Sequence, residues 1–164
     1  MMKITTTIRF IAALALGAVA LRAADAPKYG LAVENKILAQ KIVNDLMAGN
    51  PSLYSAGMHC VPPGGDAQAI VASTLNVIGK HSDPPDIEVG THGDTIISVN
   101  LKIPKIGIMM PLHDREGRLI GALALAFKYR TGEDQVKYFA EATRLRDLVA
   151  QRIPSLAELF APAR

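Results

Sequence analysis

Residues 106–127 read IGIMMPLHDREGRLIGALALAF and predict a β-hairpin, the segment that decides the fold. Apolar residues alternate along its first strand, as expected for a strand with one buried face. Residues 114–117, Asp-Arg-Glu-Gly, are typical of a type I turn closed by a glycine in the left-handed conformation. An apolar strand then returns to about residue 128. The hairpin over 105–128 therefore predicts an antiparallel sheet.

The returning strand has two unlike faces. Its large apolar side chains lie on one face, Leu119, Leu123, Leu125 and Phe127, and the other face carries Ile120, Ala122, Ala124 and Ala126. We expect the large side chains to form the core, because burial of each contributes about 1.5–3 kcal/mol. Alanines alone do not fill an ordinary interlayer space. We expect their face to meet a closely packed helix or a ligand cavity, with segment 58–60 or the helix predicted over 67–79 lying across it.

The segments around the hairpin complete an α+β pattern. Helical spacing of apolar residues predicts three longer helices, over 34–48, 67–79 and about 135–152. β-branched residues predict strands over 87–90 and 95–103, joined by a turn at 93–94. Residues 58–66 are rich in proline and glycine and predict a loop. Helices segregated onto an antiparallel sheet define the α+β class, and we expect that class here.

The first 23 residues predict a secretory signal peptide. Lys3 and Arg9 precede an apolar run over 10–21 that is about a dozen residues long, and small residues follow it. A membrane span needs about 20 apolar residues, and no later run approaches that length. We therefore expect a single mature domain over 24–164, periplasmic or secreted, with no membrane span after the leader.

The charge of the mature chain excludes a nucleic-acid-binding surface of the usual kind. The chain has 18 basic and 15 acidic residues, and three of the basic residues but none of the acidic ones lie within 1–23. The remaining chain therefore carries equal numbers of each sign. Because nucleic-acid affinity rests mainly on excess positive charge, we expect no nucleic-acid partner.

The hairpin also carries a family resemblance. Pro111-Leu112, then Asp114 and Gly117, then Leu119-Ile120-Gly121 are similar to the paired central strands of PAS-like extracytoplasmic sensor domains, the Cache group. The match covers 106–127 only. The long helix after the last strand is similar to GAF domains, a second resemblance. The Cache resemblance implies a PAS/Cache-like domain with a pocket on one sheet face for an organic acid or an amino acid, and it carries no catalytic residue.

Two neighbouring residues suggest metal or thiol chemistry. His59 and Cys60 are borderline and soft ligands that copper, zinc or haem iron would accept. Cys60 would alternatively act as a nucleophile, although adjacent residues of an extended segment point to opposite faces, so His59 would not easily serve as its base. A packed or merely exposed cysteine is the third interpretation. The histidine spacing fits no closed metal-site pattern, so we assign no metal ligands.

Other candidate ligand-binding residues lie on the predicted helix over 67–79 and on the alanine face. Ser73, Asn76 and Lys80 would share one helix face and bind a carboxylate, or form a solvated polar face. Ala122 and Ala124 would line the cavity over the sheet.

The leading functional hypothesis is an exported, sensor-type domain that binds a small molecule and has no catalytic activity. One alternative is a periplasmic redox protein that holds a metal or haem through His59 and Cys60. The other is an envelope accessory that forms a homodimer or docks on a protein partner. The cofactor is not identified by any motif.

Overall fold

The computed structural model describes residues 37–163, and the predicted leader lies outside the described residues. These residues form four helices and five strands in a mixed order. In chain order the elements are α2 (Leu38–Gly49), β1 (Leu53–Cys60), β2 (Ala69–Ser73), α3 (Pro84–His92), β3 (Ile96–Asn100), β4 (Lys105–His113), β5 (Leu119–Lys128), α4 (Gln135–Gln151) and α5 (Leu156–Leu159).

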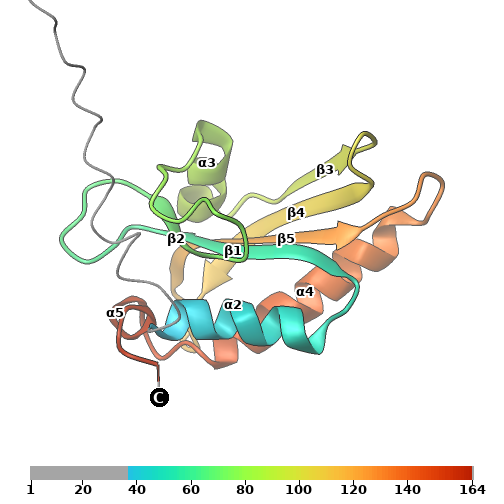
Figure 1. Cartoon of the computed structure of the whole chain (residues 1–164). Helices are drawn as coiled ribbons and strands as arrows, with labels where there is room; N and C mark the ends of the chain where they lie inside the picture. Colours follow the sequence, from blue (N-terminus) through green and yellow to red (C-terminus); the bar gives the residue numbers. More distant parts are fainter. Residues whose placement is uncertain (1–36, 164) are drawn as a thin grey trace, which may run out of the picture.

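The five strands form one antiparallel sheet in the order β2-β1-β5-β4-β3. Figure 1 shows α2 and α4 beneath one face of this sheet and α3 on the other face. The arrangement confirms the predicted α+β class, an antiparallel sheet flanked by helices. The first strand, β1, pairs with the last, β5, so segments about 65 residues apart in sequence lie side by side at the centre.

The predicted hairpin is confirmed as β4 and β5. Gly117 ends the turn with a φ of 82°, in the left-handed region where glycine is favoured. Inside the turn, one carboxylate oxygen of Asp114 accepts hydrogen bonds from the backbone N–H groups of Glu116 and Arg118 at 2.9 and 3.0 Å. A turn of this kind is held by its own side chain, which explains why its local sequence predicts it well.

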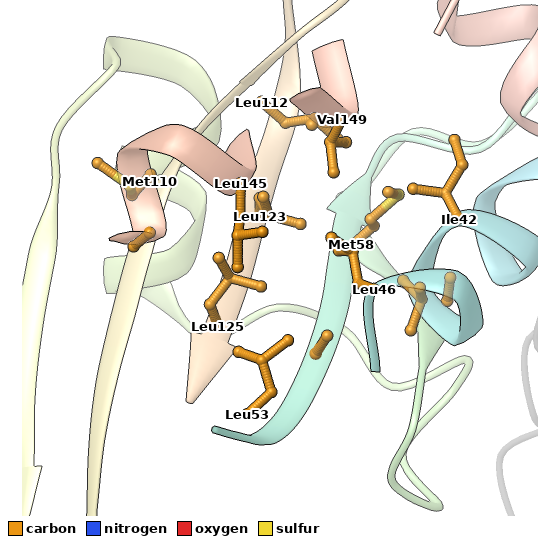
Figure 2. Close-up of a cluster of buried hydrophobic side chains, with 14 of the residues drawn as sticks. Ile42, Leu46, Leu53, Met58, Met110, Leu112, Leu123, Leu125, Leu145 and Val149 are labelled. Atoms are coloured by element: carbon orange, nitrogen blue, oxygen red, sulfur yellow. The ribbon is translucent and has the colours of Figure 1, made fainter. Parts of the chain in front are cut away.

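The core lies between the sheet and the α2/α4 layer (Figure 2). Leu123, Leu125 and Phe127 are almost completely buried there, as predicted for the large face of the returning strand. Ile42 and Leu46 reach the core from α2, and Leu145 and Val149 from α4; Met58 and Met110 complete it from the strands. Leu148 of α4, in contrast, is 51% exposed because it lies on the helix's outer side.

Two segments after α2 differ from the prediction. Residues 53–60 form strand β1 where a loop was predicted over 58–66, and residues 69–73 form edge strand β2 where a helix was predicted over 67–79. Periodicity does not separate a short apolar run in a buried strand from one in a helix. Here β2 is a strand because it pairs with β1, Ser73 with Gly57 and Ala72 with Met58. This pairing is a tertiary contact, which the local sequence does not reveal.

The predicted strand over 87–90 is helix α3. Pro84 and Pro85 occupy its first turn, where their fixed φ suits a helix and no N–H donor is lost. Gly93, predicted as a hairpin turn, instead ends α3 with a φ of 82°. Strand β3 then lies within the predicted range 95–103.

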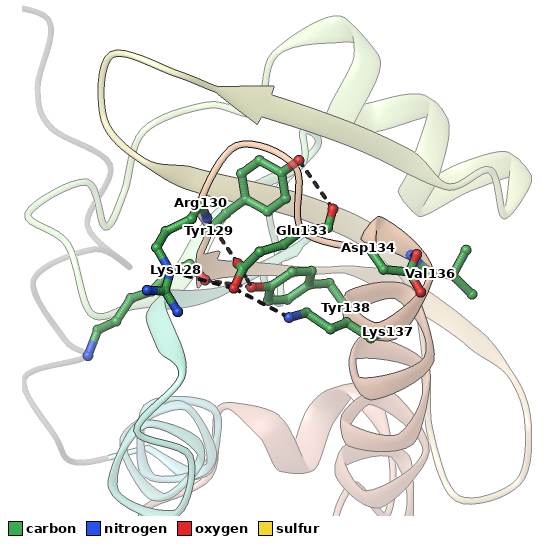
Figure 3. Close-up of polar contacts among 8 residues, drawn as sticks. All are labelled: Lys128, Tyr129, Arg130, Glu133, Asp134, Val136, Lys137 and Tyr138. Atoms are coloured by element: carbon green, nitrogen blue, oxygen red, sulfur yellow. Dashed lines mark hydrogen bonds and ion pairs between the residues drawn. The ribbon is translucent and has the colours of Figure 1, made fainter.

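Helix α4 is capped at its start by a side chain. Asp134 is the N-cap residue, and its carboxylate accepts from the backbone N–H of Val136 at 2.9 Å. Figure 3 shows the neighbouring Glu133 turned toward the Tyr138 hydroxyl and the Arg130 backbone. The Tyr138 hydroxyl also lies 3.1 Å from the carbonyl oxygen of Lys128. These contacts fix the start of α4 against the end of β5.

Candidate functional site

A cavity of about 290 Å³ lies on the sheet face opposite the core. Small ligands occupy cavities of roughly 300–1,000 Å³, so its size suits a molecule no larger than an amino acid. Its lining comes from the sheet, from the β2–α3 connection and from α3: Ser55, Ala56, Gly57, His59, Ile70, Ser73, Leu75, Val77, Asp86, Ile96, Ser98, Gly107, Ile108, Met109, Ala124, Leu125 and Ala126. We call this cavity the sheet-face pocket.

Small residues make the floor of the sheet-face pocket. Gly57 of β1 pairs directly with Ala124 of β5, and Gly107 of β4 pairs with Ala126. Side chains of strands stand roughly perpendicular to the sheet, so small ones here leave the space above the strands open. The alanine face therefore borders a cavity, one of the two environments predicted for it. Ala122 is fully buried beside His59, with which it pairs, and does not line the cavity.

The covering segment differs from both predicted ones. Segment 58–60 lies within the sheet as the end of β1, and residues 67–79 form no helix. Instead α3 packs over β4 and β5 on this face (Figure 1). Val89 is the buried anchor of α3, and Gly90 of α3 lies so close to the Gln68 amide that a Cβ there would overlap it.

His59 is the polar centre of the site. Its side chain is 7% exposed, and its Nδ1 lies 2.9 Å from the Ser82 hydroxyl and 3.7 Å from an Asp86 carboxylate oxygen. The Gln68 side-chain amide donates to the same hydroxyl at 3.3 Å and to the Asp86 carbonyl oxygen at 3.0 Å. These contacts engage one ring nitrogen and fix the ring's orientation.

The other ring nitrogen, Nε2, has no hydrogen-bond partner among the described residues. No side-chain nitrogen or oxygen of these residues is both fully buried and without a hydrogen-bond partner, so Nε2 is not completely closed off. His59 lines the sheet-face pocket. Burial lowers the pKa of His59, and the carboxylates of Asp86 and Asp83 oppose that shift only in part. The imidazole is therefore neutral near pH 7.

Cys60 lies on the opposite side of the sheet from His59. Its side chain is fully buried among core residues, and burial raises the pKa of its thiol to about 12. A thiolate, which is the nucleophilic form, is thus disfavoured. Strand alternation separates the two side chains, so the predicted metal or haem site shared by His59 and Cys60 is not formed in this arrangement. Over residues 37–163, no three acidic, histidine or cysteine side chains cluster as metal ligands.

The three polar residues predicted to share a helix face do not share one, because no helix forms there. Ser73 is buried at the edge of the sheet-face pocket, and its hydroxyl accepts from the Leu75 N–H at 3.0 Å. Asn76 and Lys80 are exposed in the following turn and do not line the cavity. Of the predicted ligand-binding set, the structure therefore brings His59, Ser73 and Ala124 together around one cavity.

Ser55, Ser82 and Asp86 are site residues that the sequence reasoning missed. Ser55 precedes His59 by four positions in β1, a spacing that places both on one face of a strand. That signal was present in the sequence, but it becomes readable only once 53–60 is recognised as a strand. No local signal points to Ser82 and Asp86, since they reach His59 through the fold.

Within the described residues, no helix has the length and apolar character needed to cross a membrane. This agrees with the predicted absence of a span after the leader.

No family model and no curated protein matches the sequence. The fold is similar to that of the type II free methionine-R-sulfoxide reductase from Thermoplasma acidophilum, with a TM-score of 0.51 and 16% identity. The similarity covers 75% of this chain and 92% of that chain. At this identity the likeness shows the fold alone.

This comparison corrects two predictions. Residues 106–127 do not identify a Cache-group sensor, because no family model supports that assignment and the solved structure that the fold resembles is a methionine sulfoxide reductase. The expected sensor-type domain without catalytic activity is also contradicted, because the fold neighbour is an enzyme. The hairpin motif did not predict the function because its turn and apolar strands specify the antiparallel sheet, and the same sheet can carry different functional sites.

Proposed function

We propose that the chain is an enzyme that reduces a small sulfoxide at the sheet-face pocket, using an external thiol as reductant. The observation that carries the proposal is His59, a buried imidazole that is fixed through Nδ1 and lines the cavity. The fold neighbour, a reductase of free methionine-R-sulfoxide, supports the reaction class. The size of the cavity supports a substrate of that order.

His59 serves as the hydrogen-bond donor to the sulfoxide oxygen in this proposal. Gln68 donates to the Ser82 hydroxyl, which leaves the hydroxyl proton available for Nδ1 of His59. That order of donation assigns the imidazole proton to Nε2, toward the cavity. A sulfoxide oxygen bound there receives a hydrogen bond, which stabilises the negative charge that grows on the oxygen as its bond to sulfur breaks.

The reaction balances with two external thiols. One thiol attacks the sulfoxide sulfur and its proton passes to the oxygen, which stays hydrogen-bonded to Nε2. The second thiol supplies the second proton, the oxygen leaves as water, and the sulfur of the second thiol displaces the thioether and forms the disulfide. The sulfoxide and two thiols thus become a thioether, a disulfide and water, and the imidazole stays neutral throughout. Cys60 is the chain's one cysteine. Its place in the core, with its pKa raised to about 12, leaves the thiols to an external dithiol.

The test is turnover of small sulfoxides by the full chain. Methionine sulfoxide, as separate R and S epimers, is incubated with a dithiol, and the thioether product is measured. The proposal expects turnover above the rate of the dithiol alone. His59→Gln should lower that rate by about 100-fold, the usual scale for one hydrogen-bond donor to a developing negative charge.

Two further variants test whether the effect is specific to His59 and whether Cys60 is the nucleophile. His81→Gln removes an exposed histidine in the β2–α3 connection and should leave turnover unchanged. Cys60→Ala should retain most of the turnover, because the thiol faces the core. A folded Cys60→Ala protein without activity would assign the nucleophile to the chain and remove the external-thiol mechanism. No turnover of either epimer, both of methionine sulfoxide and of its amide, would remove the proposed reaction.

A further inference from the structure

We infer that the sheet-face pocket takes a molecule with a cationic or neutral head group and discriminates against one with a free carboxylate. This deepens the proposed function, on which it rests for the identity of the site. The discrimination would separate this chain from a reductase of a free amino acid, which carries a carboxylate.

The charge on the lining of the cavity is negative. Asp86 is the only carboxylate in its lining, and no lysine or arginine lines it within residues 37–163. The Asp86 side chain is 24% exposed, so its carboxylate is accessible beside His59. Asp83, the N-cap residue of α3, adds a second negative charge close enough to act on the imidazole.

Two polar side chains that line the cavity are left for a ligand. Ser55 is 8% exposed and His59 is 5% exposed. Neither the Ser55 hydroxyl nor Nε2 of His59 has a partner among the described residues. Both side chains belong to one face of β1, four positions apart, which places them roughly 13 Å from each other along the strand. Two polar groups separated by an alanine and glycine floor suit a ligand with an apolar middle.

A ligand carboxylate would find no cationic side chain among the described residues that line the cavity. Transfer of an ionised carboxylate from water to an apolar cavity is costly unless a cation or several donors replace its hydration. The hydroxyls of Ser55, Ser73 and Ser98 are neutral, and the carboxylate of Asp86 repels another carboxylate. An ammonium group, in contrast, finds in Asp86 a partner of opposite charge.

The experiment compares three ligands that share one side chain. L-Methionine sulfoxide amide is cationic, free L-methionine sulfoxide is zwitterionic, and N-acetyl-L-methionine sulfoxide is anionic. Their affinities for the full chain are measured by calorimetry. We expect the amide to bind about tenfold more tightly than the free amino acid, and the acetylated acid to bind most weakly. Asp86→Asn should reduce the preference for the amide to about threefold or less. Asp147→Asn, which removes the same charge from α4 on the opposite side of the sheet, should leave the preference intact.

Equal or tighter binding of either carboxylate-bearing ligand would overturn the inference, and so would a lack of binding by all three. A preference that Asp147→Asn weakens as much as Asp86→Asn would also overturn it, since net charge alone would then explain the order. The binding measurement and the turnover measurement test the two proposals independently. The expected order of affinity without turnover would sustain this inference and remove the proposed reaction, whereas turnover with no preference would do the reverse.

Discussion

Gly121 is the residue whose replacement the backbone tolerates least. It has a φ of 152°, which L side chains rarely adopt, and a Cβ there would overlap the carbonyl oxygen of His59 and lie 2.8 Å from Sγ of Cys60. We expect Gly121→Ala to destabilise the protein by about 3 kcal/mol, from strain and overlap together. Urea unfolding measures the change. Gly49→Ala is the control, because a Cβ at the end of α2 meets nothing within 4 Å. Similar losses in the two variants would contradict this account.

Ala124 tests whether the alanine face is a binding face. It is half-buried on the floor of the sheet-face pocket, opposite Gly57. Ala124→Leu directs its added side chain into the cavity, so we expect a loss of stability below about 1 kcal/mol. Binding of methionine sulfoxide amide should be lost. Ala142→Leu, placed in the closed core, should instead cost about 1–3 kcal/mol and leave binding intact. Unaltered binding by Ala124→Leu would show that the ligand lies elsewhere.

At the scale of elements, Glu133 holds the connection between β5 and α4. The hydrogen bond from Tyr138, together with the Arg130 backbone N–H, lowers the pKa of Glu133 to about 2, and Lys137 contributes at 3.5 Å (Figure 3). A carboxyl whose pKa is lowered on folding stabilises the folded state above its ordinary pKa of 4.5. That contribution is lost as the pH falls from 4.5 toward 2.

We therefore expect Glu133→Gln to lower the melting temperature at pH 7 and to flatten its fall between pH 4.5 and pH 2. Melting curves followed by circular dichroism at several pH values measure both effects. Asp66→Asn, an exposed carboxylate in the β1–β2 loop, controls for the loss of one negative charge. A Glu133→Gln profile parallel to the unmodified one throughout this range would show that the carboxylate does not stabilise the connection.

The elements that the sequence predicts well are those that carry their own local signals. The β4–β5 hairpin has its Asp114–Gly117 turn, and α2 and α4 have amphipathic spacing over three or more turns. β1, β2 and α3 lack such signals. Their short apolar runs fit a strand or a helix equally, and Pro84-Pro85 suits a turn as well as the start of a helix. Long-range pairing in the sheet decides these cases.

At the scale of the whole molecule, the candidate site depends on contacts between segments far apart in sequence. His59 and the alanine face were predicted as separate features, and the pairing of β1 with β5 unites them. Ser82 and Asp86 reach His59 only because the chain leaves β2, crosses the sheet face and forms α3. Residue spacing does not encode that path, so their role in orienting the imidazole was not predictable from the sequence.

The two faces of the sheet divide the molecule into a stabilising side and a candidate functional side, and α4 provides the sharpest test of the first. Leu145 is 1% exposed and Leu148 is 51% exposed, three positions apart on the same helix. Leu145→Ala should destabilise the protein by about 2–5 kcal/mol, because it leaves a cavity where α4 meets the sheet (Figure 2). Leu148→Ala should change stability by less than about 0.5 kcal/mol in the isolated protein. Urea unfolding at two protein concentrations measures both. A large, concentration-dependent loss in Leu148→Ala would mean that the outer side of α4 is itself covered in solution, which would make the predicted homodimer the stabilised form.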